Sequence, residues 1–263
     1  LRRDEASKTA LTVVEGDSRE IDPPEGISLL WTDPPFGTNK VWADEEGSYK
    51  DTDVAGAIDL TMTVLKRWLP KMLPDGVVCI CLDDRAVHDV IYLMKKDLGW
   101  VHRGDVIWTF GLGRPRTSWW PRRHNTIATF TRTEESGRFD HSTVPREARH
   151  KGHVPTIDYP EDRPCGSVWE KTMSQTDAER VGYPSQKPLS IVAPFVRAHT
   201  LEGELVVDPF LGSGTTAEAA LSSERRFFGC DQNPESLRVT RARVGSSVGR
   251  SRFLEDLDPG KNT

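Results

Sequence analysis

Four consecutive residues, Asp33-Pro34-Pro35-Phe36, combine an acid, two prolines and an aromatic ring. Each proline fixes its own φ at about −65° and has no N–H to donate, so the acid and the ring flank a stiff, extended loop. A carboxylate accepts hydrogen bonds, and an aromatic ring stacks on flat ligands. The stretch therefore predicts a rigid ligand-binding turn, although a strand followed by a plain Pro-Pro turn has the same pattern.

A second unusual stretch, Asp208-Pro-Phe-Leu-Gly-Ser-Gly-Thr-Thr, lies in the last third of the chain. Its glycines allow the backbone to approach a ligand closely, and an acid at the end of the next strand, Asp231, can bind a ribose. Gly212 to Ala217 fits the G-x-G-x-x-A dinucleotide pattern, which is a weak match when it stands alone. It is not a P-loop, because no lysine follows the second glycine.

The segment from Gly111 to His124 is basic and aromatic and contains no acid. Such a mixture suits phosphate contact and base stacking, whereas the alternative is a solvated loop fixed by a buried tryptophan pair. The residues expected to bind nucleic acid are Arg114, Arg116, Arg122 and Arg123, interleaved with Trp119 and Trp120.

Strands and helices alternate along most of the chain. Apolar runs predict strands at 11–14, 27–32, 77–82, 106–110, 125–131, 204–207 and 226–230. Apolar residues at helical spacing predict helices at 54–69, 86–98, 188–200, 215–222 and 234–244, with a polar loop at 37–52, a turn at 73–76 and a polar insertion at 133–182. This alternation favours a mainly parallel sheet with helices on both faces. Ligands in such sheets bind at the carboxyl ends of strands, so Asp33 and Asp208 are expected to be neighbours.

Composition limits the class of protein. The 263 residues are enough for one large domain, and a hydrophobic content of 36% with a mean hydropathy of −0.53 predicts a soluble chain. No apolar run approaches the roughly 18 residues of a membrane span, and no signal-peptide pattern is present. The four cysteines are scattered, which favours a reducing, cytoplasmic setting over disulfides or zinc. A net charge of −5 leaves room only for a local basic face.

Four motifs together resemble those of the amino-group DNA methyltransferases. The Asp208 stretch is similar to their S-adenosylmethionine motif, and Asp33-Pro-Pro-Phe to their catalytic motif, with Phe36 in place of the more usual Tyr. Tyr183-Pro-Ser-Gln-Lys-Pro-Leu resembles their Q-K-P motif, and Gly16-Asp-Ser the element near the cofactor adenine. The catalytic motif precedes the cofactor motif, which is the order of the β group. The resemblance covers about residues 11–132 and 165–244.

The resemblance implies a doubly wound, mainly parallel Rossmann-like α/β fold with a small inserted recognition region. Residues 1–132 would form the catalytic half, 133–164 the target-recognition insertion, 165–244 the cofactor half and 245–263 a flexible tail. S-adenosylmethionine would be the cofactor, with no metal. The implied cofactor residues are Asp17 on the adenine side, Asp231 at the ribose, Lys187 near the carboxylate, and Asp208, Phe210, Gly212, Ser213, Gly214 and Thr215 around the methionine.

The implied reaction is methylation of adenine N6 in double-stranded DNA. Asp33 and the Pro34 carbonyl would accept the amino hydrogens, while Pro35 stiffens the loop and Phe36 stacks on a base swung out of the duplex. The resemblance associates Asp at the first motif position mainly with adenine and Ser with cytosine N4. The short insertion predicts either a short target or a homodimer sharing the duplex, and a restriction enzyme is a possible partner.

Other interpretations stay open at this point. N4-cytosine DNA methyltransferases belong to the same amino-group family, and RNA N6-adenosine methyltransferases share the motif order. An NAD-dependent oxidoreductase would explain the glycine-rich turn but leaves Asp33-Pro-Pro-Phe without a role, and a catalytically silent nucleic-acid-binding subunit would not need intact motifs. Pro164-Cys165 resembles the nucleophile motif of cytosine-C5 methyltransferases, but nothing else of that family is present.

Overall fold

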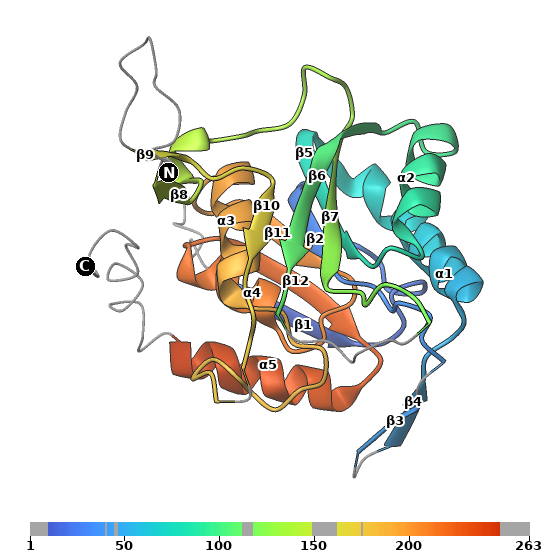
Figure 1. The fold of residues 1–263 in the computed structure, drawn as a ribbon. Coiled ribbons are helices and arrows are strands. Elements are labelled where there is room, and N and C mark those ends of the chain that lie inside the picture. Colours follow the sequence, from blue (N-terminus) through green and yellow to red (C-terminus); the bar gives the residue numbers. More distant parts are fainter. Residues whose placement is uncertain are drawn as a thin grey trace, which may run out of the picture.

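An eight-stranded sheet forms the centre of the molecule, with the strand order β1-β12-β11-β2-β5-β7-β6-β10 (Figure 1). This computed structural model describes residues 10–39, 41–44, 47–111, 118–148, 162–174 and 176–247. The strands of the sheet are β1 (Leu11–Glu15), β2 (Ile27–Thr32), β5 (Met72–Leu82), β6 (Val101–Thr109), β7 (His124–Thr131), β10 (Val168–Glu170), β11 (Leu205–Asp208) and β12 (Arg226–Asp231). Every neighbouring pair is parallel except those that involve β7, which confirms the mainly parallel sheet.

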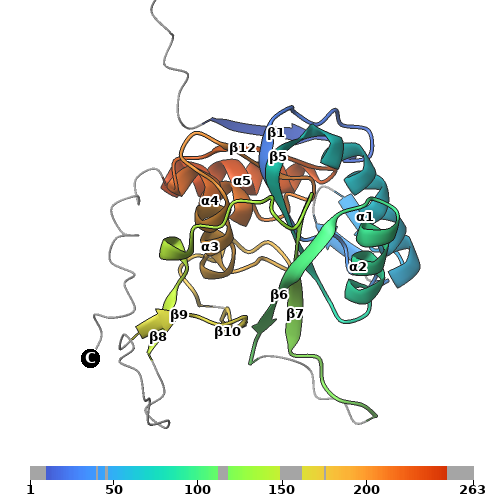
Figure 2. The same ribbon diagram turned by 90° about the horizontal axis from the view of Figure 1, so that it is seen from above.

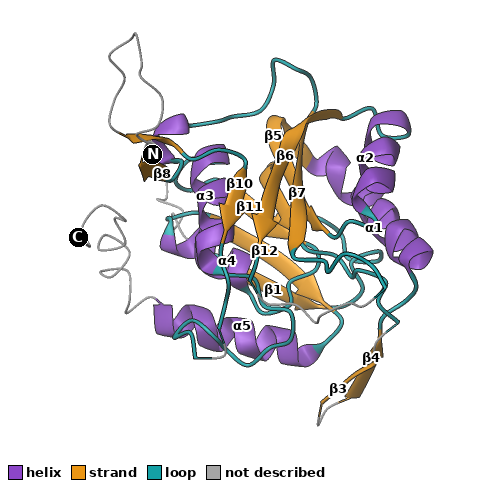
Figure 3. Ribbon diagram, in the orientation of Figure 1, coloured by secondary structure: helices purple, strands orange, loops and turns teal. Residues whose placement is uncertain are grey.

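Helices cover both faces of this sheet, as Figures 2 and 3 show. They are α1 (Val54–Trp68) and α2 (Val87–Lys96) on one face, and α3 (Leu189–His199), α4 (Thr215–Ser222) and α5 (Pro234–Ser247) on the other. Alternate residues of β2 feed two separate cores, because side chains along a strand point to opposite faces. Leu30 packs into the core under α1 and α2, whereas Leu29 and Trp31 pack into the core under α3 and α4.

The chain leaves β2 and β11, which are neighbours, toward opposite faces of the sheet. The next helix after β2 is α1, and the next helix after β11 is α4. Since the two strands are parallel, their carboxyl ends meet at one edge, together with those of β1 and β12. Open α/β sheets bind ligands at the point where two neighbouring strands lead to helices on opposite faces. This edge is called the catalytic edge below.

Several sequence expectations need correction. The expected polar loop at 37–52 contains a hairpin of β3 (Val41–Asp44) and β4 (Gly47–Lys50), which projects from the body of the molecule (Figure 1). The expected turn at 73–76 is instead a bulge inside β5, because the pairing with β2 jumps from Met72 to Val77. The expected flexible tail is helical as far as Ser247, the end of α5, and residues 248–263 lie outside the described residues.

The described part of the expected insertion at 133–164 is attached at the opposite edge of the sheet, away from the catalytic edge. β8 (Arg146–Ala148) and β9 (Asp162–Pro164) form a small antiparallel pair, but β10 joins the central sheet beside β6. Arg138 forms ion pairs with Asp75 near the start of β5 and Glu204 just before β11. The described part of 133–164 is therefore anchored far from the strand ends of the catalytic edge. Among the described helices, none combines the length and apolarity needed to cross a membrane.

Candidate active site

A cavity of about 810 Å³ opens at the catalytic edge. Loops that follow β1, β2, β11 and β12 line it, together with the segment 181–187 that leads into α3. Its size lies in the range of about 300–1,000 Å³ found for small-molecule sites. The expected site residues that line it are Asp33, Pro34, Pro35, Phe36, Lys187, Asp208, Phe210, Gly212, Ser213, Thr215 and Asp231.

Asp208 fixes the shape of the loop after β11. Thr32 Oγ1 donates to its Oδ1 at 2.9 Å, and Thr216 Oγ1 donates to its Oδ2 at 2.7 Å. The Phe210 amide also donates to Oδ1, at 3.0 Å. Burial raises the pKa of Asp208 to about 7, while these hydrogen bonds act in the opposite direction. The carboxylate thus ties β2, the loop and the start of α4 together, in agreement with the expected closeness of the two motifs.

The glycine-rich turn needs its glycines for backbone conformation and for close packing. Gly212 and Gly214 have φ of 50° and 73°, a region that disfavours other residues. A Cβ on Gly214 would lie 2.3 Å from Thr240 Oγ1, so α5 packs directly on this turn. Gly214 itself does not line the cavity and instead caps the start of α4.

Asp231 presents a half-buried carboxylate to the same turn. Its Oδ2 accepts from the Gly212 amide at 2.8 Å, and its Oδ1 accepts from the Asn233 amide at 3.0 Å. Burial raises the pKa of Asp231, and the two amides oppose that shift. The Asp17 side chain, by contrast, does not line the cavity: Arg19 Nε donates to it at 3.0 Å, and this contact lowers the pKa of Asp17.

Sequence reasoning missed two residues that hold the Asp33–Phe36 loop. Arg85, just after β5, donates to the carbonyls of Phe36 at 3.0 Å and Gly37 at 3.4 Å. Asp51 is buried, and its Oδ2 accepts from both the amide and the hydroxyl of Thr38 at 2.6 Å. Both residues lie in polar runs next to a strand or helix end, which was the only indication in the sequence.

Lys187 lies against the first residue of the catalytic motif. Its Nζ donates to Asp33 Oδ2 and is 5.2 Å from the centroid of the Phe36 ring. No hydrogen bond among the described residues reaches Asp33 Oδ1, which is buried. Burial raises the pKa of Asp33, and the Lys187 charge opposes that rise. Burial alone would lower the pKa of Lys187, but the charge of Asp33, the hydrogen bond to it and the nearby Cys81 and Asp208 together raise that pKa, so the lysine stays protonated.

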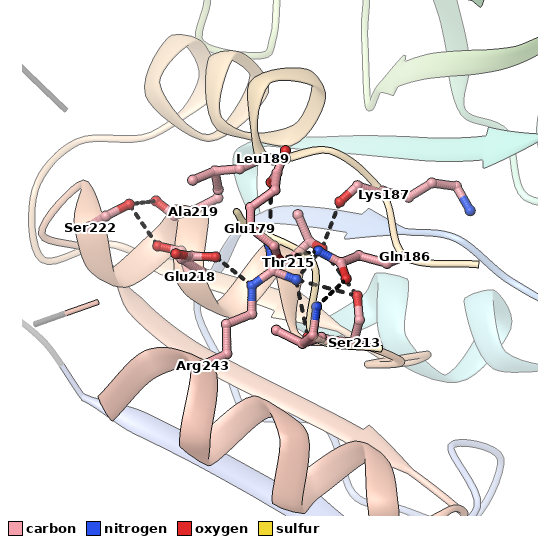
Figure 4. Close-up of polar contacts among 11 residues, drawn as sticks. Glu179, Gln186, Lys187, Leu189, Ser213, Thr215, Glu218, Ala219, Ser222 and Arg243 are labelled. Carbon is pink, nitrogen blue, oxygen red and sulfur yellow. Dashed lines mark hydrogen bonds and ion pairs between the residues drawn. The ribbon is translucent and has the colours of Figure 1, made fainter. Parts of the chain in front are cut away.

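Buried Arg243 of α5 connects the cofactor-type turn to the segment that carries Lys187 (Figure 4). Its guanidinium forms an ion pair with Glu218, and its Nη1 donates to Thr215 Oγ1 at 2.9 Å. Thr215 Oγ1 in turn donates to the Lys187 carbonyl at 2.9 Å. A weaker ion pair of 3.7 Å joins Arg243 to Glu179. The network fixes both walls of the cavity relative to α5.

The expected nucleic-acid segment follows β6 at the catalytic edge. Arg114 and Arg116 lie outside the described residues. Arg122 forms an ion pair with Asp84 at 2.6 Å, whereas Arg123 is exposed. Trp119 and Trp120 are 72% and 79% exposed, so the alternative of a buried tryptophan pair is wrong. No cluster of three or more His, Cys, Asp or Glu that could hold a metal occurs in the part of the chain that the structure describes.

A family model described as DNA methylase matches residues 27–242. Type II methyltransferase M.HpaI of Haemophilus parainfluenzae is 25% identical over 186 residues, which are 68% of this chain but only 58% of that protein.

Two solved structures share the fold. The complex of M1.HpyAVI with SAM has a TM-score of 0.59 and 20% identity, and the match covers 88% of this chain and 98% of that one. The cytosine-N4-specific PvuII DNA methyltransferase has a TM-score of 0.67 and 21% identity, with 89% and 87% covered. These likenesses confirm the Rossmann-like α/β fold.

Proposed function

The chain belongs to the DNA methylase family, and we propose that it transfers a methyl group from S-adenosylmethionine to N6 of adenine in double-stranded DNA. The observation that carries the proposal is one cavity in which the Asp33–Phe36 loop faces the glycine-rich turn after β11. An oxidoreductase would use the turn but would leave the lysine-paired Asp33 without a function.

The cavity has the chemistry that S-adenosylmethionine requires. The Asp231 carboxylate lines it and is half-buried, as a partner for ribose hydroxyls would be. Gly212 lines the cavity and has no side chain, so the backbone there can approach the methionine part. On the adenine side, Gly16 and Ser18 line the cavity, whereas Asp17 is paired with Arg19.

When bound, S-adenosylmethionine supplies an electrophilic methyl group, whose C–S bond breaks with its electron pair going to sulfur as the new N–C bond forms. The residues of the chain act on the acceptor amine, whose lone pair is delocalised into the base. The Asp33 carboxyl group lines the cavity, so it can accept an amino hydrogen. Phe36 lines the same cavity and can stack on a flipped base. After transfer the nitrogen carries a positive charge, and it releases one proton to water.

Adenine is proposed because the motif begins with Asp33. In the family that the motifs resemble, Asp at this position is associated mainly with methylation of adenine. The fold does not separate the two bases, because the structurally similar PvuII enzyme is cytosine-N4-specific. The duplex is proposed to lie against Arg123 and the exposed Trp119 and Trp120, which follow β6 at the catalytic edge. A homodimer, a restriction enzyme partner and target recognition by 133–164 remain predictions.

Mass spectrometry of nucleosides tests the proposal. Double-stranded DNA treated with the protein and S-adenosylmethionine is digested and analysed, with Asp33→Asn protein as the control. N6-methyladenine that depends on Asp33 is the expected product. N4-methylcytosine alone would overturn the choice of base. If only RNA becomes methylated, the DNA substrate is wrong, and if no nucleoside is methylated, the activity is wrong.

A further inference from the structure

Lys187 contacts the catalytic carboxylate rather than standing apart at the far wall of the cavity. Its ammonium donates to Asp33 Oδ2 and to the Ser185 carbonyl at 3.2 Å, and it lies 5.2 Å from the Phe36 ring centroid. Both side chains are largely shielded, with 8% and 19% of the Lys187 and Asp33 side chains exposed. The lysine is therefore beside the two groups that would hold the target base.

The backbone around Lys187 is held by buried polar contacts. Thr215 donates to its carbonyl at 2.9 Å, and Gln186 Nε2 donates to the Glu179 carbonyl at 2.7 Å. The Gln186 Oε1 accepts from the Val181 amide at 3.0 Å. A side chain on such a fixed segment can place its charge with little loss of entropy, which is what a positioning residue requires.

We propose that Lys187 is a positioning residue for the catalytic carboxylate: its ammonium keeps Asp33 ionised and, through the contact with Oδ2, fixes the orientation of the carboxylate at the cavity wall. The role of Asp33 toward the target amine rests on the proposed function, but the ion pair does not. A buried carboxylate without a compensating charge takes up a proton instead of staying ionised. A protonated Asp33 would accept a hydrogen bond from the amine more weakly than the ion does.

The other ionisable groups that face the pair give no alternative source of positive charge. Cys81 of β5 lies beside Asp33, and burial raises the pKa of its thiol well above the ordinary value. Asp208 of β11 is a second carboxylate, which adds negative charge. Lys187 is the cation among the described residues that contacts Asp33.

The first experiment measures the ionisation of Asp33 without any cofactor or DNA. Carbon-13 NMR follows the Asp33 carboxyl carbon against pH, with Asp33→Asn used to assign its signal. In Lys187→Met the midpoint should rise by roughly 1–3 pH units, because a nearby opposite charge shifts a carboxyl by that amount. Lys66→Met, which removes an exposed lysine of α1, should leave the midpoint unchanged. An unchanged midpoint in Lys187→Met would overturn the proposal.

The second experiment separates the carboxylate role from binding of the cofactor. Lys187→Met should bind S-adenosylmethionine within about threefold of the wild type. Its single-turnover methylation at saturating cofactor should fall about tenfold or more at neutral pH and recover at higher pH, as Asp33 ionises above its raised pKa. Lys187→Arg, which keeps the charge, should restore part of the rate.

Two kinetic results would overturn the inference. A tenfold weaker cofactor affinity with a wild-type rate at saturation would assign Lys187 to the cofactor carboxylate. A faster rate in Lys187→Met would show that the lysine only blocks the place of the base. Wild-type protein that methylates no nucleic acid would instead refute the proposed function, and the NMR titration would still decide the state of Asp33.

Discussion

At the level of single residues, Asp33 pairs with Lys187 and, in the proposed reaction, also accepts a hydrogen bond from the target amine. Asp33→Ala should lower methyl transfer by about 10²–10³-fold or more, since the variant loses the charged acceptor for the amino hydrogen and keeps only the Pro34 carbonyl. Calorimetry should still detect S-adenosylmethionine binding, because Asp231 and the glycine-rich turn are intact. The variant should also lose about 3–5 kcal/mol of stability, because a buried ammonium is left without its partner.

Asp59→Asn provides a control for this experiment, since Asp59 is an exposed acid on α1. Its activity and unfolding midpoint should equal those of the wild type. An Asp33→Ala enzyme that methylates at the normal rate would remove the catalytic assignment, whatever its stability.

Asp208 gives a prediction about stability and pH. Burial raises its pKa from an ordinary 3.8 to about 7, so between these values the folded state holds a proton that the unfolded state has released. The free energy of unfolding should therefore fall as pH rises from about 4 to 7, by ~4 kcal/mol at most from this group. Asp208→Asn cannot titrate, so its denaturant midpoints should decline less over that range. A parallel decline in both proteins would show that other groups cause it.

At the level of elements, α5 lines the cavity with its first residues, Pro234 and Glu235, and supports the glycine-rich turn further along the helix. Its Arg243 connects Glu218 of α4 with the turn at Ser213 and Thr215. Arg243→Met should cost about 3–5 kcal/mol of unfolding free energy, because Glu218 is left as a buried charge without its main cation. Binding of S-adenosylmethionine should weaken as well, since the turn loses its anchor.

Arg241→Met is the matched control on the same helix, because Arg241 is exposed two residues away. Its stability should change by less than about 0.5 kcal/mol. In a double-mutant cycle, Glu218→Gln should cost less in the Arg243→Met background than alone. Additive effects would mean that the ion pair does not contribute to the fold.

The whole fold was more predictable from the sequence than the contacts inside the site. Apolar periodicity located every α-helix in the described part of the chain and the strands of the central sheet except β10, whose three residues have no distinctive pattern. It could not assign the direction of β7, because pairing direction depends on tertiary neighbours. The closeness of Asp33 and Asp208 followed from the topology of parallel strands. The Lys187–Asp33 pair did not, because 154 residues separate its partners and no local pattern records the contact.

The predicted DNA face follows β6 at the catalytic edge. Two adjacent arginines on it, Arg122 and Arg123, are expected to contribute differently to DNA binding. Arg123 is exposed at the catalytic edge, whereas the Arg122 side chain is held by Asp84 at 2.6 Å. Removing one cation that neutralises a phosphate of duplex DNA should flatten the slope of log K against log[salt] by about 0.9. We therefore expect a flattening of about 0.9 in Arg123→Met and of less than half as much in Arg122→Met. Asp84→Asn should steepen the slope, since it releases Arg122 toward the duplex. Equal flattening in the two arginine variants would mean that DNA opens the pair with Asp84, and no change in either would place the DNA-binding face on other elements.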